Sequence, residues 1–313
     1  MNTIAEKFTD TNKTEKERNP KNNRWTGYQN QLDRLMRFVF VASAVTVTLI
    51  IFSIIAFVGV QGVKTFADIT PFHFFFGLDW TPSQNQFGAF SFIFSTLLLT
   101  GLSVIFAVPL ALSGAVFMAK IAPKWVREIM RPATDLFVGI PSVVYGLIGL
   151  TVIVPWLAQF NEGFGYGILP AAIILAVMIL PTILAISEDA IRALPGRLEE
   201  ASLALGATRW QTIWRVLIPA CRPGIITGII LGMGRAIGET MAVFMVIGNS
   251  PQMPKSLLDS ATVLTTAIVK DMGNTHFGST WNNALFLMAL LLLLISLSLI
   301  IVIRFVAKRS ELK

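Results

Sequence analysis

Two opposite charges lie in an otherwise uncharged stretch of the sequence, residues 223–247. Arg235 stands about 12 residues into it, roughly 18 Å along a helix and near mid-membrane if the stretch spans a bilayer. A lone Arg there costs about 2.5–3.5 kcal/mol on insertion scales, so it needs a compensating group. Glu239 follows four residues later, on the same face of a continuous helix. The spacing predicts an ion pair inside the membrane.

This pair has two interpretations. It is either a structural ion pair that holds the helix against its neighbours, or an oxyanion site. In the second case the planar fork of Arg235 donates to phosphate-type oxygens. Glu239 then accepts a hydrogen bond from a protonated oxygen, which favours hydrogen phosphate over sulfate. Replacement of Arg235 by Gln separates the two, since the first predicts loss of assembly and the second predicts loss of transport alone.

The same stretch carries a stripe of small residues, Gly224, Gly228 and Gly232. Small residues every four positions allow close packing of membrane helices. Arg235 and Glu239 each follow one of these glycines by 11 residues, which returns to nearly the same face of a helix. We therefore expect the charges to face protein or a water-filled path, not lipid.

The elements that position these residues are predicted to be membrane helices. The chain is 54% apolar and 14% charged, whereas soluble domains carry about 25% charged residues. A helix of roughly 20 apolar residues crosses the hydrocarbon core. The expected fold is therefore an all-α, polytopic membrane protein with six transmembrane helices. Their predicted positions are about 38–62, 90–119, 134–158, 168–187, 223–247 and 283–303.

Basic residues predict the orientation of the spans. With the N-terminus inside, 21 of the 25 Lys and Arg residues fall in cytoplasmic segments. The outer loops hold only Lys64, Lys255 and Lys270. Lys and Arg are enriched on the cytoplasmic side, so both termini are expected there. The net charge of +7 is explained in this way, and nucleic acid is not an expected partner.

The remaining segments complete the predicted organisation. Residues 1–35 are polar and are expected to be a mostly disordered cytoplasmic tail, and residues 305–313 a C-terminal one. Residues 36–89 hold the first span and an outer loop, and the first apolar run is too long for a cleavable signal peptide. Within the outer loop at 248–282, the stretch 256–270 is either a short helix or a re-entrant turn.

Residues 188–222 predict two short helices at the cytoplasmic face. The first runs from about 196 to 205 and ends at Gly206, a common helix stop. Thr208 and Gln211 form a capping box that begins the second. The hairpin is either a passive interfacial element or a knob that docks into a partner.

This hairpin resembles the EAA motif of binding-protein-dependent ABC importer permeases. The matching residues are Glu200, Ala201, Ser202 and Gly206, followed by Val216-Leu217-Ile218-Pro219, with Ser202 and Val216 as mild departures. The resemblance implies a type I ABC importer permease fold with its core at 90–304. It also implies that the loop docks into a separate ATPase, with Glu200 in contact and Gly206 allowing the turn.

The runs 235–242 and 139–146 look like those of phosphate importer permeases of the PstC type. This resemblance implies a bacterial inner-membrane complex with a second permease (PstA type), two ATPases (PstB type) and a periplasmic phosphate-binding protein (PstS type), embedded in lipid. It also implies that Arg235 and Glu239 line the substrate pathway near the subunit interface.

Enzymatic functions are disfavoured by the sequence. It contains no G-x-x-x-x-G-K-[ST] loop, so ATP hydrolysis is expected on a partner. A single cysteine and two distant histidines give no metal or nucleophile constellation, and no cofactor is expected. The alternatives are an importer permease for sulfate or molybdate and, from another class, a secondary transporter. The latter leaves the EAA-type loop unexplained.

Overall fold

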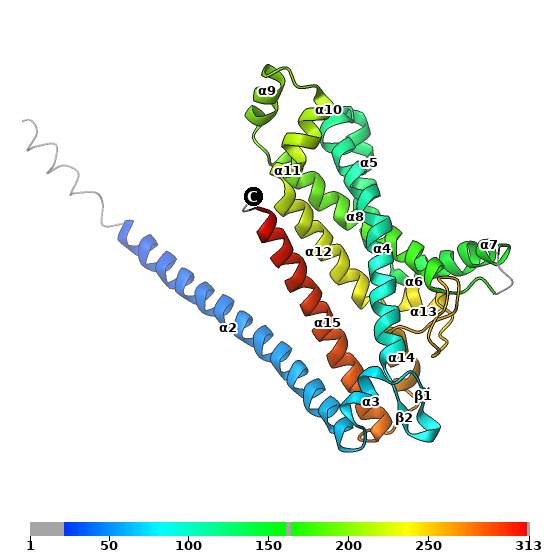
Figure 1. The fold of residues 1–313 in the computed structure, drawn as a ribbon. Helices are drawn as coiled ribbons and strands as arrows, with labels where there is room; N and C mark the ends of the chain where they lie inside the picture. The colour runs from blue at the N-terminus through cyan, green and yellow to red at the C-terminus, as the bar shows by residue number, and fades with distance from the viewer. Residues whose placement is uncertain (1–21, 161–163, 312–313) are drawn as a thin grey trace, which may run out of the picture. The chain divides into compact units, whose positions relative to one another are not determined.

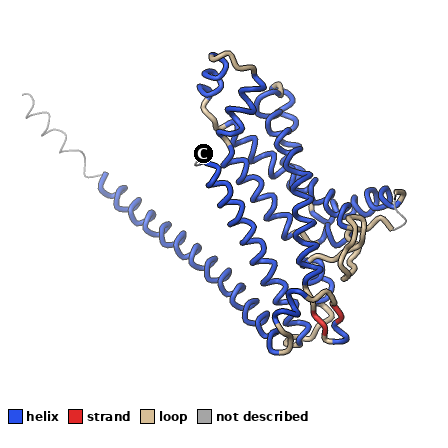
Figure 2. Tube along the Cα trace, viewed as in Figure 1, coloured by secondary structure: helices blue, strands red, loops and turns tan. Residues whose placement is uncertain are grey.

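The computed structural model describes residues 22–160 and 164–311 of the chain, and these are almost entirely helical (Figures 1 and 2). By its internal contacts the chain divides into two units, 1–57 and 58–313. The structure confirms the all-α class, to which it adds one two-stranded ribbon drawn red in Figure 2.

The first unit contains most of α2 (Asn22–Val63). From Phe38 to Phe57 this helix is apolar and largely exposed, the composition of a membrane span. It begins at Asn22, so the 22–35 part of the predicted disordered tail is helical. Extending a helix is far less costly than nucleating one, which allows the span to continue into polar sequence. The rest of that tail, 1–21, lies outside the described residues.

The second unit begins with a region that packs around aromatic side chains. Phe74, Trp80, Phe87 and Phe92 are buried with residues of α14 and α15. The strands β1 and β2 pair antiparallel, with Trp80 opposite Phe87. The elements are η1 (Lys64–Ala67), α3 (Pro71–Phe76), β1 (Trp80–Thr81), η2 (Pro82–Gln84) and β2 (Gln86–Phe87).

Four long helices form the bundle of the second unit. In Figure 1, α4 (Phe90–Val116), α8 (Ile168–Arg192), α12 (Arg222–Gly238) and α15 (Thr280–Glu311) run side by side, and α12 contacts the other three. Fully buried Ala107, Ala111 and Ala115 recur every four residues on α4, in the core that it shares with α8. Small residues at this spacing allow the close approach of two membrane helices.

Shorter helices connect these elements. They are η3 (Phe117–Ile121), α5 (Lys124–Gly139), α6 (Ser142–Ile148), η4 (Gly149–Ile153), α7 (Val154–Ala158), α9 (Gly196–Ala204), α10 (Arg209–Thr212), η5 (Ile213–Leu217), α11 (Ile218–Ala220), α13 (Met241–Val246) and α14 (Leu264–Met272). Of the stretch 256–270, for which a short helix or a re-entrant turn was expected, residues 264–270 belong to the helix α14.

Among residues 22–160 and 164–311, four helices are long and apolar enough to cross a membrane, or up to six if each of two bent helix pairs is one span. The long ones agree with the predicted first, second, fourth and sixth spans. The predicted third span, 134–158, falls on one of the bent pairs, because the helix breaks between α5 and α6 and the two parts meet at 95°. Pro141 explains the break, since a proline disfavours helical geometry at the preceding residue, and Ile140 is extended.

Candidate functional site

The helix that carries Arg235 ends before Glu239. The α12 helix stops at Gly238, and Glu239 has an extended backbone with φ −70° and ψ 130°. After Thr240 the chain turns into α13. The Glu239 carboxylate accepts a hydrogen bond from the Ala242 N–H at 3.3 Å, so it caps the next helix. The Glu239 carbonyl accepts a hydrogen bond from the Thr265 hydroxyl of α14 at 3.1 Å, so a second helix also holds the backbone at the break.

The predicted continuous span over 223–247 is therefore wrong at this point, and the predicted direct pair is not formed. A separation of four residues places two side chains on one face only where the helix is unbroken. No ion pair joins Arg235 to Glu239 in the part of the chain that the structure describes. Both side chains are half-buried. Gly238 lowers the helix propensity at the break, and the capping bond at Ala242 stabilises the new start.

The Arg235 guanidinium makes no hydrogen bond or ion pair with any other described residue. Tyr145 of α6 donates to the Phe137 carbonyl at 2.8 Å, across the bend between α5 and α6. A half-buried, unpaired guanidinium within a membrane helix is costly unless water or an anion compensates it. Arg235 is thus chemically available to an anionic ligand.

The structure brings together the two runs that the sequence singled out, 139–146 and 235–242. The α6 helix packs against α13. A Cβ atom at Gly146 would lie 2.9 Å from the Ala242 Cα atom, so only glycine allows this approach. The start of α13, just after the break at Glu239, therefore packs on α6, which follows the break at Ile140.

The glycine stripe of α12 faces α8. A Cβ atom at Gly224 would lie 2.3 Å from the Ala190 Cβ atom, and one at Gly232 would lie 2.6 Å from Ile183 Cγ1. At Gly228 the neighbour is the Ile183 carbonyl oxygen, at 3.3 Å. The stripe thus lies where the helices approach most closely, which fixes the helix that carries Arg235 against α8.

The hairpin of α9 and α10 lies at one end of the bundle (Figure 1). The predicted capping box is confirmed, since the Thr208 hydroxyl accepts from the Gln211 N–H at 3.3 Å and the Gln211 side chain accepts from the Thr208 N–H at 2.9 Å. Gly206 has φ +82°, a left-handed backbone that favours glycine, so the turn between the helices depends on it. Glu200 and Ala201 are exposed on α9.

Ser202, which departs from the usual alanine of the motif, is the one buried residue of α9. Its hydroxyl lies 2.9 Å from the Thr212 hydroxyl, and this buried hydrogen bond joins α9 to α10. Thr212 also donates to the Thr208 carbonyl at 3.1 Å. Serine at position 202 therefore adds a hydrogen bond between α9 and α10 that the usual alanine could not make.

Three ion pairs that the sequence did not predict lie at the same end of the second unit. Lys120 Nζ is 2.7 Å from Glu199 Oε2, and Arg131 Nη2 is 3.1 Å from Asp189 Oδ1. The third pair joins Glu188 to Arg192 within α8. Only that pair has a local signal, a separation of four residues on a helix. The other two join segments 58 or more residues apart.

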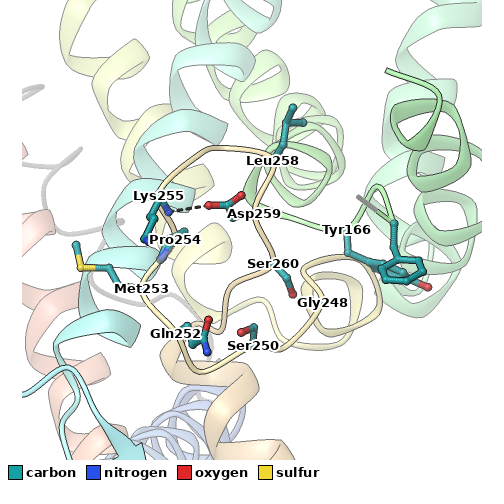
Figure 3. Close-up of a pocket in the computed structure, with 11 residues that line it drawn as sticks. Tyr166, Gly248, Ser250, Gln252, Met253, Pro254, Lys255, Leu258, Asp259 and Ser260 are labelled. Atoms are coloured by element: carbon teal, nitrogen blue, oxygen red, sulfur yellow. Dashed lines mark hydrogen bonds between the residues drawn. The ribbon is translucent and has the colours of Figure 1, made fainter. Parts of the chain in front are cut away.

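A cavity of about 620 Å³ with a mixed polar and apolar lining lies in the loop that follows α13 (Figure 3). Asp259 accepts hydrogen bonds from the backbone N–H groups of Lys255 and Ser256 at 2.8 Å each, which closes the loop tip. The Ala261 N–H donates to the Ile247 carbonyl at 3.1 Å and closes its base. Tyr166, from the segment before α8, lines the cavity.

Within residues 22–160 and 164–311, no group of three or more His, Cys, Asp or Glu side chains is placed to hold a metal ion.

Comparison with known proteins gives consistent matches over most of the chain. The family described as "Binding-protein-dependent transport system inner membrane component" matches residues 111–311. A probable ABC transporter permease protein YqgH of Bacillus subtilis (strain 168) is 46% identical over 287 residues, which cover 90% of this chain and 93% of that one. The phosphate transport system permease protein PstC of Pasteurella multocida (strain Pm70) is 33% identical over 296 residues, 88% and 89% of the two chains.

A solved structure shares the fold at low sequence identity. The crystal structure of a bacterial ABC transporter involved in the import of the acidic polysaccharide alginate matches with a TM-score of 0.56 and 19% identity. The match covers 89% of this chain and 99% of the other. At this identity it supports the type I permease fold and nothing finer.

Proposed function

Because this chain belongs to the family of binding-protein-dependent transport system inner membrane components, and to its PstC-type permeases, we propose that it is the permease subunit of an ATP-driven importer of inorganic phosphate. The choice of phosphate as the substrate rests on the similarity of this chain to relatives named as phosphate transport system permeases. The half-buried, unpaired Arg235 supports the same conclusion, since guanidinium groups suit phosphate oxygens.

The proposed complex contains a PstA-type second permease, a PstB-type ATPase dimer and a PstS-type binding protein. The helix α9 docks into the ATPase through Glu200, and closure of the ATPase dimer moves the hairpin and the spans connected to it. Both termini are cytoplasmic in this proposal, as the distribution of Lys and Arg predicts. ATP is hydrolysed by the partner.

In the proposed pathway, phosphate approaches the point where α6, α12 and α13 meet. Arg235 donates to the phosphate oxygens. Glu239 either accepts from a protonated phosphate oxygen or keeps its cap on α13 while the site is empty. The role of Arg235 thus requires its charge and its planar fork.

The test compares Arg235→Gln with Arg235→Lys in the complex reconstituted into liposomes. We expect both variants to assemble, uptake to fall roughly tenfold or more in Arg235→Gln, and an intermediate rate in Arg235→Lys. Gly234→Ala is the matched control, because a Cβ atom there meets nothing within 4 Å. Loss of assembly in Arg235→Gln would instead identify a structural residue.

Competition experiments test the choice of anion. Unlabelled phosphate should suppress uptake of labelled phosphate, whereas sulfate and molybdate at equal concentration should not. Suppression by sulfate or molybdate would indicate an importer for another oxyanion. Uptake by the chain without an ATPase would indicate a secondary transporter.

A further inference from the structure

The helix α9 has few apolar contacts to hold it in place. Only one of its residues is buried, and Leu205, which follows it, is 90% exposed. Its covalent link to α8 runs through Ala193 and Leu194 to an exposed Pro195. The position of α9 therefore depends on a small number of polar contacts.

Two such contacts join α9 to other elements. The first is the buried Ser202–Thr212 hydrogen bond to α10. The second is the ion pair between Glu199 of α9 and Lys120 of η3, which continues from α4. The chain also links α9 covalently to α8 at Pro195 and to α10 through the Gly206 turn. The hydrogen bond adds to the attachment to α10, whereas the ion pair attaches α9 to η3, to which the hairpin has no direct covalent link.

Lys120 lies on a segment that is itself held against α8. The Arg192 guanidinium of α8 donates to the Met118 carbonyl of η3 at 3.4 Å and pairs with Glu188, which is 3% exposed. Just before η3 in the chain, α4 packs on α8, where a Cβ atom at Gly114 would lie 2.7 Å from Leu184 Cδ1. The ammonium group that Glu199 contacts is therefore attached to a fixed support.

We propose that Lys120 and Glu199 form a strut that holds α9 to the end of α4, so that movement applied at α9 by the ATPase reaches α4 as well as α12. Both are positioning residues, since neither lies in the proposed substrate pathway. Glu199 immediately precedes Glu200, the expected ATPase contact, so force enters the helix beside the strut. The role of the strut in coupling rests on the proposed function, but its two residues both belong to this chain, so the strut forms without a partner protein.

The first test measures the strut without any partner. Hydrogen exchange of the α9 amides is followed in the purified chain for Lys120→Glu, for Glu199→Lys and for the double swap. Lys120 is 19% exposed and Glu199 36%, so part of the pair energy is lost to solvent screening. We expect exchange to be about fivefold faster in each single variant and to return to within about twofold of wild type in the swap. Unchanged exchange in the single variants would refute the strut.

The second test measures coupling in the assembled transporter. The single variants should assemble and hydrolyse ATP, with about fivefold less phosphate moved per ATP, and the swap should restore the ratio. Lys124→Glu is the matched control, because it makes the same charge change at an exposed site that forms no ion pair among the described residues. Where charge reversal prevents assembly, Lys120→Gln and Glu199→Gln are measured in the same way.

The results separate the strut from the proposed function. A swap that transports as poorly as the single variants, or single or neutral variants that transport like wild type, would refute the coupling role. A wild-type chain that recruits no ATPase would refute the proposed function, while the exchange result would still decide whether the strut exists.

Discussion

A close contact between α12, the helix that carries Arg235, and α8 gives a prediction that can be worked out from the structure. Gly224→Ala in α12 adds one methyl group, which would lie 2.3 Å from the Ala190 Cβ atom of α8. Ordinary van der Waals contacts begin at 3.4 Å, so the two atoms would be roughly 1 Å too close. The Ala190 Cβ atom is fixed to its backbone, so rotation of the side chain cannot relieve the contact.

The magnitude follows from two opposing terms. Overpacking of this kind costs about 1–3 kcal/mol. Alanine is favoured over glycine by up to about 1 kcal/mol in a helix interior, and by less in the first turn, where residue 224 lies. We therefore expect Gly224→Ala to lower the free energy of unfolding by roughly 1–2 kcal/mol.

The assay is unfolding of the purified chain in detergent, in a double-mutant cycle with Ala190→Gly. Removal of the opposing methyl group leaves the nearest remaining Ala190 atom at 3.5 Å, so the double variant should recover most of the loss. Gly234→Ala serves as the control and should be neutral or stabilising, because its Cβ atom meets nothing within 4 Å. A Gly224→Ala chain as stable as wild type, or no recovery with Ala190→Gly, would refute the packing argument.

Three further predictions concern the hairpin and the helix breaks. Thr212→Val should destabilise the chain by about 1–2 kcal/mol in the same assay and more than Ser202→Ala does, because it leaves the buried Ser202 hydroxyl without its partner; equal losses would count against the asymmetry. Gly206→Ala should lower the free energy of unfolding by about 1 kcal/mol, because alanine disfavours the positive φ, while its Cβ atom would meet no atom within 4 Å. Gly206→Asn should lower it by less, because asparagine tolerates this backbone conformation better. Unfolding in denaturant measures both variants. Gly146→Val should separate α6 from α13 and reduce phosphate uptake, because its Cβ atom meets Ala242 backbone; normal uptake would contradict this.

The sequence predicts the parts of the fold that depend on composition and on local chemistry. Uncharged length identified the spans, because the hydrocarbon core requires it. The Thr208–Gln211 capping box was found from spacing alone, because both partners lie in one helical turn. The helix of the hairpin was expected to end near 205 and ends at Ala204.

The parts that the sequence did not predict depend on tertiary contacts. The break at Glu239 is stabilised by Thr265, which is 26 residues away, so no local pattern reports it. The ion pair of Lys120 with Glu199 joins residues 79 apart in the chain. The expected Arg235–Glu239 pair failed for the same reason, since it assumed a continuous helix through a position where a competing cap exists.

The central claim is that a separate ATPase drives phosphate through this chain, and one measurement tests it most directly. The chain is reconstituted with the proposed second permease, ATPase and binding protein, and entry of labelled phosphate into the liposomes is followed with ATP and with a non-hydrolysable analogue. The account predicts accumulation against a gradient that requires hydrolysis. Equal entry under both conditions, or entry with the chain alone, would contradict it.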